Sequence, residues 1–197
     1  MNWIKKIFGG NRKENNQDEY KLSLDEIYLH EDLYCQVELL PLENTNTLET
    51  ENKKIDEFAK EHSDGAGFTD IYARDESKIK TSEKGIHLDV FESLIISLGF
   101  VKMRNVYSGY GNYKEKCQNT NAYSIDGATF FCDYKNGVIN NIWLDGFRFN
   151  NESDFVKEMT EGLFQIGKKW KLTLNDWDLT ERINLENKFA IELYIKE

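Results

Sequence analysis

Cysteine and proline are scarce in this 197-residue sequence, which has three cysteines and a single proline. Cys35, Cys117 and Cys132 form an odd set without Cys-x-x-Cys spacing, which predicts reduced thiols in a reducing compartment, the cytoplasm by default. The lone proline, Pro41, is typical of a compact domain with little linker. Long apolar runs and a secretory signal are also missing, so we expect a soluble chain without a membrane-spanning segment.

Motifs that hold metals or cofactors are missing as well. The three histidines, His30, His62 and His87, are far apart, and none belongs to an HExxH-type set. Zinc sites need ligands at short, fixed spacings, and calcium loops need oxygen ligands at alternate positions, which the aspartates here do not provide. We therefore expect neither a metal nor a cofactor.

No catalytic motif is recognisable either. His62-Ser63-Asp64 contains the residue types of a hydrolase triad, but neighbours in sequence at a helix end cannot align base, nucleophile and orienting acid. Cys117 has Lys114 and Lys116 nearby, which favours a thiolate, yet no base is identifiable. Gly109-Tyr110-Gly111 lacks the lysine and Ser/Thr of a phosphate loop. We expect a protein that is not an enzyme, and the second alternative is an enzyme with an unrecognised site.

Negative charge is abundant: 35 acidic residues against 25 basic ones give a net charge of −10. The first 13 residues contain basic charges only, Lys5, Lys6, Arg12 and Lys13, so the rest of the chain is more acidic than the total indicates. Such a surface repels phosphate backbones and anionic lipids, and it accelerates encounter with basic surfaces. We therefore expect a basic protein partner and no nucleic acid.

Residues 1–20 are predicted to form a short basic amphipathic segment and a flexible linker, ahead of a single domain over residues 21–197. Residues 9–19 lack periodicity and apolar content, as tethers do. The segment either docks on the domain or a partner, or associates weakly with a membrane surface without stable insertion. On a helix, four apolar side chains would share one face: Trp3, Ile4, Ile7 and Phe8.

The first half of the predicted domain shows two strand patterns and two helix patterns. Apolar and polar residues alternate up to Pro41, as in a half-buried strand, and Thr47 is placed to cap the helix that follows. Apolar residues cover most of the girth of the second helix, which predicts a well-buried element closed by Gly99. The expected elements are strands over residues 34–41 and 68–73 and helices over residues 47–62 and 88–98.

Two turn dipeptides mark the centre of the chain. Asp126-Gly127 and Asn136-Gly137 permit positive φ at both turn positions and lie between apolar runs, so they predict a three-stranded antiparallel meander. A helix capped by Asn151 or Ser153 and ending at Gly167 is expected to lie across it. The remaining elements are strands over residues 120–125, 129–134, 138–147, 170–174 and 179–185, and a helix over residues 187–195 with Phe189, Ala190, Leu193 and Tyr194 on one face.

The order of these elements predicts an α+β fold class. We expect a mainly antiparallel sheet with the three-stranded meander at its centre. The helices are expected to pack against this sheet, because each of them has an apolar stripe that must be buried.

Two groups of residues are candidates for partner binding. Tyr107, Tyr110 and Tyr113 recur at three-residue intervals in a loop of Tyr, Ser, Gly and Asn, a composition typical of recognition loops. The alternative is that one or two of these rings plug the edge of the sheet. The second group is acidic, and its alternative is an ordinary solvated surface. Its members are Glu31, Asp32, Asp64 and Asp70.

Four segments resemble a known class of proteins: residues 31–38 (EDLYCQVE), 64–72 (DGAGFTDIY), 107–113 (YSGYGNY) and 117–120 (CQNT). They look like segments of small acidic bacterial proteins similar to the immunity proteins of polymorphic-toxin and contact-dependent secretion systems. The resemblance covers residues 31–148. It implies a protein that neutralises a toxin by covering a basic active site with an acidic surface, and it implies no catalytic residues. A general interaction or adaptor module is the alternative function.

Overall fold

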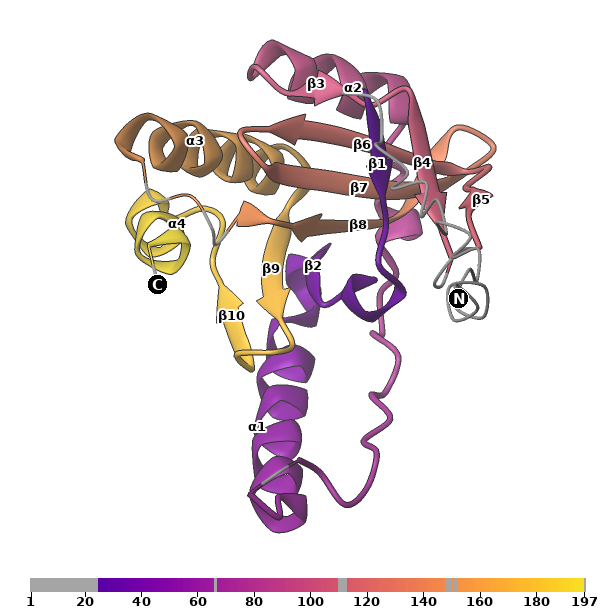
Figure 1. Cartoon of the computed structure of the whole chain (residues 1–197). Helices are drawn as coiled ribbons and strands as arrows, with labels where there is room; N and C mark the ends of the chain where they lie inside the picture. Colours follow the sequence, from indigo (N-terminus) through magenta and orange to yellow (C-terminus); the bar gives the residue numbers. More distant parts are fainter. Residues whose placement is uncertain (1–24, 66, 110–112, 148–149, 151, 197) are drawn as a thin grey trace, which may run out of the picture.

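The computed structural model describes residues 25–65, 67–109, 113–147, 150 and 152–196. At the centre of this part is a seven-stranded antiparallel sheet in the order β10-β9-β2-β8-β7-β6-β3 (Figure 1). The predicted α+β class with a mainly antiparallel sheet is therefore confirmed. The strands are β2 (Val37–Pro41), β3 (Val101–Lys102), β6 (Thr120–Ile125), β7 (Ala128–Lys135), β8 (Val138–Asp145), β9 (Leu172–Asp176) and β10 (Glu181–Ile183).

The predicted meander forms β6, β7 and β8. Both turn dipeptides have positive φ at both positions, 46° and 93° in Asp126-Gly127 and 54° and 76° in Asn136-Gly137. This twist matches the right-handed twist of the flanking strands, which is why these residue types occur there. Ala122 pairs with Phe131, and Phe131 pairs with Trp143, so the three strands share one sheet as expected.

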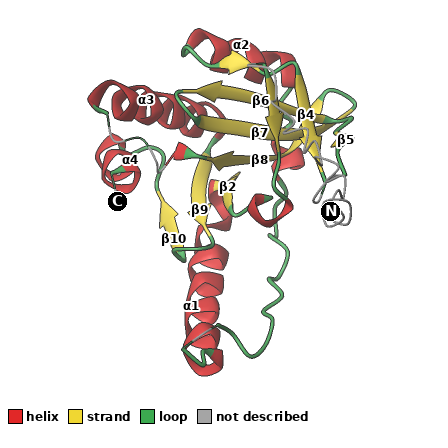
Figure 2. Cartoon of the chain, in the orientation of Figure 1, coloured by secondary structure: helices red, strands yellow, loops and turns green. Residues whose placement is uncertain are grey.

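A small second sheet and four helices complete the described part (Figure 2). The small sheet has the order β1-β4-β5, with β1 parallel to β4. Its strands are β1 (Glu26–Tyr28), β4 (Asn105–Ser108) and β5 (Glu115–Lys116). The helices are α1 (Thr45–His62), α2 (Leu88–Ser97), α3 (Ser153–Trp170) and α4 (Lys188–Ile195), with short 3-10 turns η1 (Glu31–Leu33), η2 (Leu42–Asn44) and η3 (Thr81–Lys84).

The large sheet buries side chains on both faces, because successive residues of a strand point to opposite sides. Phe130 and Ile142 belong to the main core, together with apolar residues of α2, α3 and α4. Phe131 and Trp143 point the other way and stack with ring centroids 5.4 Å apart. This second core also contains Val106 of β4. The small sheet therefore covers part of the face opposite α2, α3 and α4, and Figure 1 shows β1 and β4 crossing in front of the meander.

The third helix is longer than predicted. It continues through Gly167 to Trp170, and Lys171 supplies the left-handed residue (φ 56°) that follows the helix. Gly167 is needed for packing: a Cβ there would lie 2.2 Å from Cβ of Leu185. The residue in the N-cap position is Glu152 rather than Ser153, and Asn151 lies outside the described residues.

The predicted inner faces of two helices are partly wrong. In α4 the buried residues are Ile191, Tyr194 and Ile195, whereas Phe189 is 74% exposed. In α2 only one side is buried, through Phe91 and Ile95. An apolar residue identifies a helix face only when a neighbouring element covers it, and the described structure covers these helices on one side.

The first half of α1 packs on the large sheet, where Leu48 clusters with Leu40 of β2 and Asn52 exchanges hydrogen bonds with Asn175 of β9. Its second half projects away from the sheet, and the chain returns beside it (Figures 1 and 2). The predicted strand over residues 68–73 is wrong. Its one ladder contact is an isolated bridge between Ser63 and Phe68, and the segment lies beyond the sheet, where no strand can pair with it. The C-terminal part of α1 and the returning segment, residues 53–76, are called the arm below.

Two predictions about the ends and the environment of the chain remain. The basic segment and linker over residues 1–20 lie outside the described residues. None of the helices in the described part of the chain combines the length and the apolar character needed to cross a membrane.

Candidate functional site

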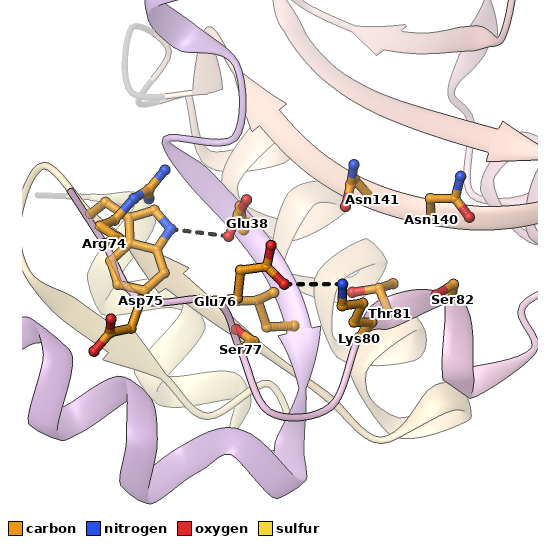
Figure 3. A pocket seen from close by; sticks show the side chains of 12 residues that line it. Glu38, Arg74, Asp75, Glu76, Ser77, Lys80, Thr81, Ser82, Asn140 and Asn141 are labelled. Carbon is orange, nitrogen blue, oxygen red and sulfur yellow. Dashed lines mark hydrogen bonds and ion pairs between the residues drawn. The ribbon is translucent and has the colours of Figure 1, made fainter.

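A groove of about 440 Å³ opens at the base of the arm. We call it the Glu38 groove. Its walls come from β2, from β8, from the returning segment with its continuation into η3, and from the residue that follows β9 (Figure 3). The lining is mostly polar, with charges of both signs. It consists of Glu38, Leu40, Arg74, Asp75, Glu76, Ser77, Lys80, Thr81, Ser82, Asn140, Asn141 and Trp177.

Strand alternation places Glu38 in the groove. Val37 and Leu39 point to the main core, so Glu38 between them points to the opposite face. One carboxylate oxygen accepts a hydrogen bond from the indole Nε1 of Trp177 at 3.1 Å. Burial disfavours the charged form and raises the pKa of Glu38, and hydrogen bonds from Cys35 and Trp177, with the positive charge of Arg74, offset this only in part.

Trp177 is held rigidly behind Glu38. The preceding residue, Asp176, is fully buried and accepts hydrogen bonds from the backbone amides of Asp178 and Leu179, both at 3.0 Å. This Asx turn fixes the backbone around the indole. The guanidinium carbon of Arg74 lies 4.5 Å from the centroid of the Trp177 ring, within the range of a cation–π contact.

The segment that closes the groove is fastened to the base of α1. Asn44 bonds both backbone groups of Ile79, donating to its carbonyl at 2.7 Å and accepting from its amide at 3.1 Å. Glu51 accepts hydrogen bonds from the Tyr72 hydroxyl at 2.7 Å and from the amide of Asp75 at 3.2 Å. The groove wall is therefore a fixed part of the fold.

Cys35 lies beside the groove but is a poor nucleophile. Its φ of 55° is in the left-handed region, which is unusual for a buried residue with a side chain. Burial raises the pKa of its thiol, and the neighbouring Glu38 carboxylate raises it further, so the thiol stays protonated at neutral pH. The neighbouring Tyr34 hydroxyl donates to Asp133 at 2.7 Å and accepts from Asn141 at 3.1 Å.

The end of the arm exposes large apolar side chains. Phe68 is 67% exposed and Ile71 is 89% exposed, and the acidic candidate Asp70 lies between them in the sequence. Over residues 53–76 there are seven acidic and four basic residues. Buried residues of α1 are confined to its first half, so the rest of the helix contributes little to the core.

The structure separates the predicted partner-binding residues into three places. Asp64 and Asp70 lie together on the returning segment of the arm, and both are exposed. Glu31 and Asp32 lie in η1, ahead of β2. Of the tyrosine candidates, Tyr107 lies in β4 of the small sheet and Tyr113 precedes β5, and Figure 1 shows these two strands at the other side of the molecule from the end of the arm.

The predicted tyrosine loop is partly a strand. Tyr107 lies in β4, where its hydroxyl donates to Glu26 at 3.3 Å and Lys114 lies over its ring. Tyr113 is 65% exposed and donates to Glu115 at 3.1 Å. Tyr110 lies outside the described residues. Tyr113 therefore keeps the exposure that an interface residue needs, whereas Tyr107 belongs to the fold.

The sequence interpretation missed the Glu38 groove. Its residues come from four segments, and Glu38 and Trp177 are 139 positions apart. One signal was available, because Asn140-Asn141 interrupts an otherwise apolar strand pattern. Within the described ranges no cluster of His, Cys, Asp and Glu could hold a metal ion. The chain matches no protein-family model, no curated protein and no solved structure.

Proposed function

We propose that this chain is an acidic binding protein that neutralises a basic protein toxin in the cytoplasm, in the manner of an immunity protein. The observation that carries the proposal is the arm, where Phe68 and Ile71 are exposed among acidic side chains. A few large apolar residues supply most of the binding energy of an interface, and surrounding charges select the partner. The chain works by binding the toxin and masking its active site, without turnover and without nucleic acid.

Charge and shape support the arm as the binding surface. The arm projects from the sheet, so it can enter a cleft on a partner (Figure 1). Its excess of acidic residues complements a basic cleft, and the net charge of the whole chain, −10, accelerates encounter with such a partner. The resemblance of residues 31–148 to immunity proteins makes a toxin the expected partner.

The test first asks whether a toxin-like protein is encoded beside this chain in its own genome, as the proposal expects, and then uses that protein. Co-expression of the full chain should restore growth of cells that produce the toxin domain, and the two purified proteins should form a complex. The association rate should fall markedly between low and physiological salt, while the dissociation rate changes less, because steering acts on encounter. A partner that binds but has no toxic activity would make the chain an adaptor and overturn the proposal.

Substitution at the arm should separate binding from folding. Phe68→Ala should weaken the complex by about 2 kcal/mol, or roughly thirtyfold in Kd, with an unchanged melting temperature. Phe189→Ala is the matched control, because Phe189 on α4 is an equally exposed phenylalanine outside the arm. Asp70→Lys should act mainly on the association rate.

The other predicted partner-binding residues are tested by the same measurement of toxin affinity. Tyr110→Ala and Tyr113→Ala test the recognition-loop interpretation, and Glu31→Lys, Asp32→Lys and Asp64→Lys test the acidic one. If the tyrosine variants lose affinity while Phe68→Ala does not, the binding surface is the small sheet and the arm proposal is wrong.

A further inference from the structure

Glu38 differs from the other carboxylates near the groove in having no ion-pair partner. Among the described residues, Glu76 pairs with Lys80 at 3.0 Å and Glu51 pairs with Lys54 at 3.0 Å, whereas no lysine or arginine makes an ion pair with Glu38. The nearby charge of Arg74 offsets the burial of Glu38 only in part, and a largely buried carboxylate without an ion-pair partner is costly to the fold. A cation that entered the groove would remove that cost.

The wall beside Glu38 already binds one guanidinium group. Arg74 lies over the Trp177 ring at 4.5 Å, while its Nη1 donates to the carbonyl of Cys35 at 3.5 Å. The indole face and the nearby backbone carbonyl are thus shown to accept a planar cation. Arg74 occupies only part of the site, because the groove retains a volume of about 440 Å³. This volume lies in the range of about 300–1,000 Å³ that ligand pockets have.

The groove also has acceptors on β8, the strand that pairs with β2. Asn140 and Asn141 of β8 line the groove together with Glu38 (Figure 3). Their amide oxygens can accept the N–H groups of a guanidinium that Glu38 does not bind. Three carboxylates line the groove, Glu38, Asp75 and Glu76, against two cations, Arg74 and Lys80. The lining therefore favours a positively charged group over a negative one.

We infer that the Glu38 groove is a receptor for a single basic side chain, an arginine in preference to a lysine, presented by the protein partner. The inference rests on the proposed function for the source of that side chain. The guanidinium forms a charge-assisted pair with Glu38, and the Asn140 and Asn141 oxygens accept its remaining donors. Arginine is preferred because its planar fork can bond a carboxylate and the neighbouring amide oxygens at once, which the compact ammonium of lysine does not match.

The test uses the full chain and a small probe, N-acetyl-arginine amide, in place of the partner. Titration should move the indole N–H signal of Trp177 in nitrogen–proton correlation spectra, because this group donates to Glu38. The signal is assigned by its loss in Trp177→Phe. Half-saturation is expected on the order of 1–10 mM, as a single side chain buries little surface. The neutral probe N-acetyl-citrulline amide has the same shape and should not move the signal.

Two variants should change the affinity for the arginine probe in opposite directions. Glu38→Gln keeps an acceptor for Trp177 and should weaken probe binding by about tenfold or more, as expected for the loss of a charged partner. Asn140→Asp adds a carboxylate to the groove lining on β8 and should tighten binding. Glu186→Gln is the matched control, because Glu186 pairs with Lys171 away from the groove.

The outcomes distinguish this inference from the proposed function. If the arginine probe moves nothing, or moves the Trp177 signal no more than the citrulline probe does, the groove is not a cation receptor, even where the chain binds a toxin. If the probe binds, depends on Glu38 and is displaced by the toxin, the inference holds. If the probe binds but no basic partner is inhibited, the receptor stands and the proposed function fails.

Discussion

The meander and the arm use apolar residues in opposite ways. In the meander, Phe130 and Phe131 are fully buried on opposite faces of one strand, each against a different core. On the arm, Phe68 and Ile71 lie in solvent, in a segment with one isolated bridge and no sheet. Residues of similar chemistry therefore stabilise the fold in one region and remain available for contact in the other. Stability and binding can be changed separately in such a molecule.

The largest difference is expected between two phenylalanine truncations. Phe130→Ala removes a ring that packs against Phe100 and should lower the free energy of unfolding by about 3–5 kcal/mol. Phe68→Ala should change it by less than about 0.5 kcal/mol, because an exposed ring loses little on truncation. Urea denaturation of the two variants measures both. Similar losses would show that Phe68 is packed and that the arm is part of the core.

A second contrast concerns backbone strain. Gly137→Val should destabilise the chain by about 1–3 kcal/mol, because a β-branched residue is penalised at positive φ. The effect is strain and not a clash, since no atom lies within 4 Å of a Cβ built at Gly137. Gly67→Val on the arm is the control, where φ is not positive and a Cβ is equally free of neighbours. The melting temperatures of both variants measure this difference. An unchanged melting temperature for Gly137→Val would refute the turn assignment.

The smallest effects come from two carboxylates at the base of the arm, whose pKa values move in opposite directions. Burial acts to raise the pKa of Glu51, but hydrogen bonds from Tyr72, Lys54 and the Asp75 amide lower it overall. Burial raises the pKa of Glu38, and its partners offset this only in part. Glu51→Gln should therefore cost about 1–2 kcal/mol at neutral pH. Glu38→Gln should stabilise the free chain slightly.

The pH dependence follows from these directions. A group with a lowered pKa contributes stability above its unfolded pKa, and this contribution is lost as the pH falls through the folded value. A carboxyl with a raised pKa favours the folded state at low pH, and this advantage is lost as the pH rises through the folded value. The melting temperatures of the two variants should therefore diverge as the pH rises from about 4 to 7. Parallel curves would mean that Glu38 is compensated in the fold.

Local chemistry in the sequence was sufficient for the meander and for the approximate positions of the helices. Asn136-Gly137 and Asp126-Gly127 specify their turns through φ preferences that need no distant partner, and β6 ends where expected. The strand over residues 68–73 failed for the opposite reason. Its apolar residues satisfy the pattern of a strand, but pairing requires a neighbour, and the end of the arm has none.

Gly167 shows the same limit at the scale of one residue. The sequence offers a glycine near the end of a helical pattern, which is typical of a helix terminus. The glycine is instead inside α3, because Leu185 leaves no room for a Cβ, and Lys171 takes the left-handed position. A pattern within one segment cannot distinguish a glycine that is needed for a positive φ from a glycine that is needed because a neighbouring side chain leaves no room for a Cβ.

The sequence by itself determined the acidic charge, the α+β class and the meander, because these depend on composition and on neighbours along the chain. Only the tertiary structure decided that α1 projects as an arm, that Phe189 faces solvent, and that Glu38 and Trp177 meet in a groove. Each of these depends on which surfaces come together between segments far apart in sequence, with 139 positions between Glu38 and Trp177. The burial of a residue, and hence its charge state and its availability for binding, is a property of those contacts and not of the residue alone.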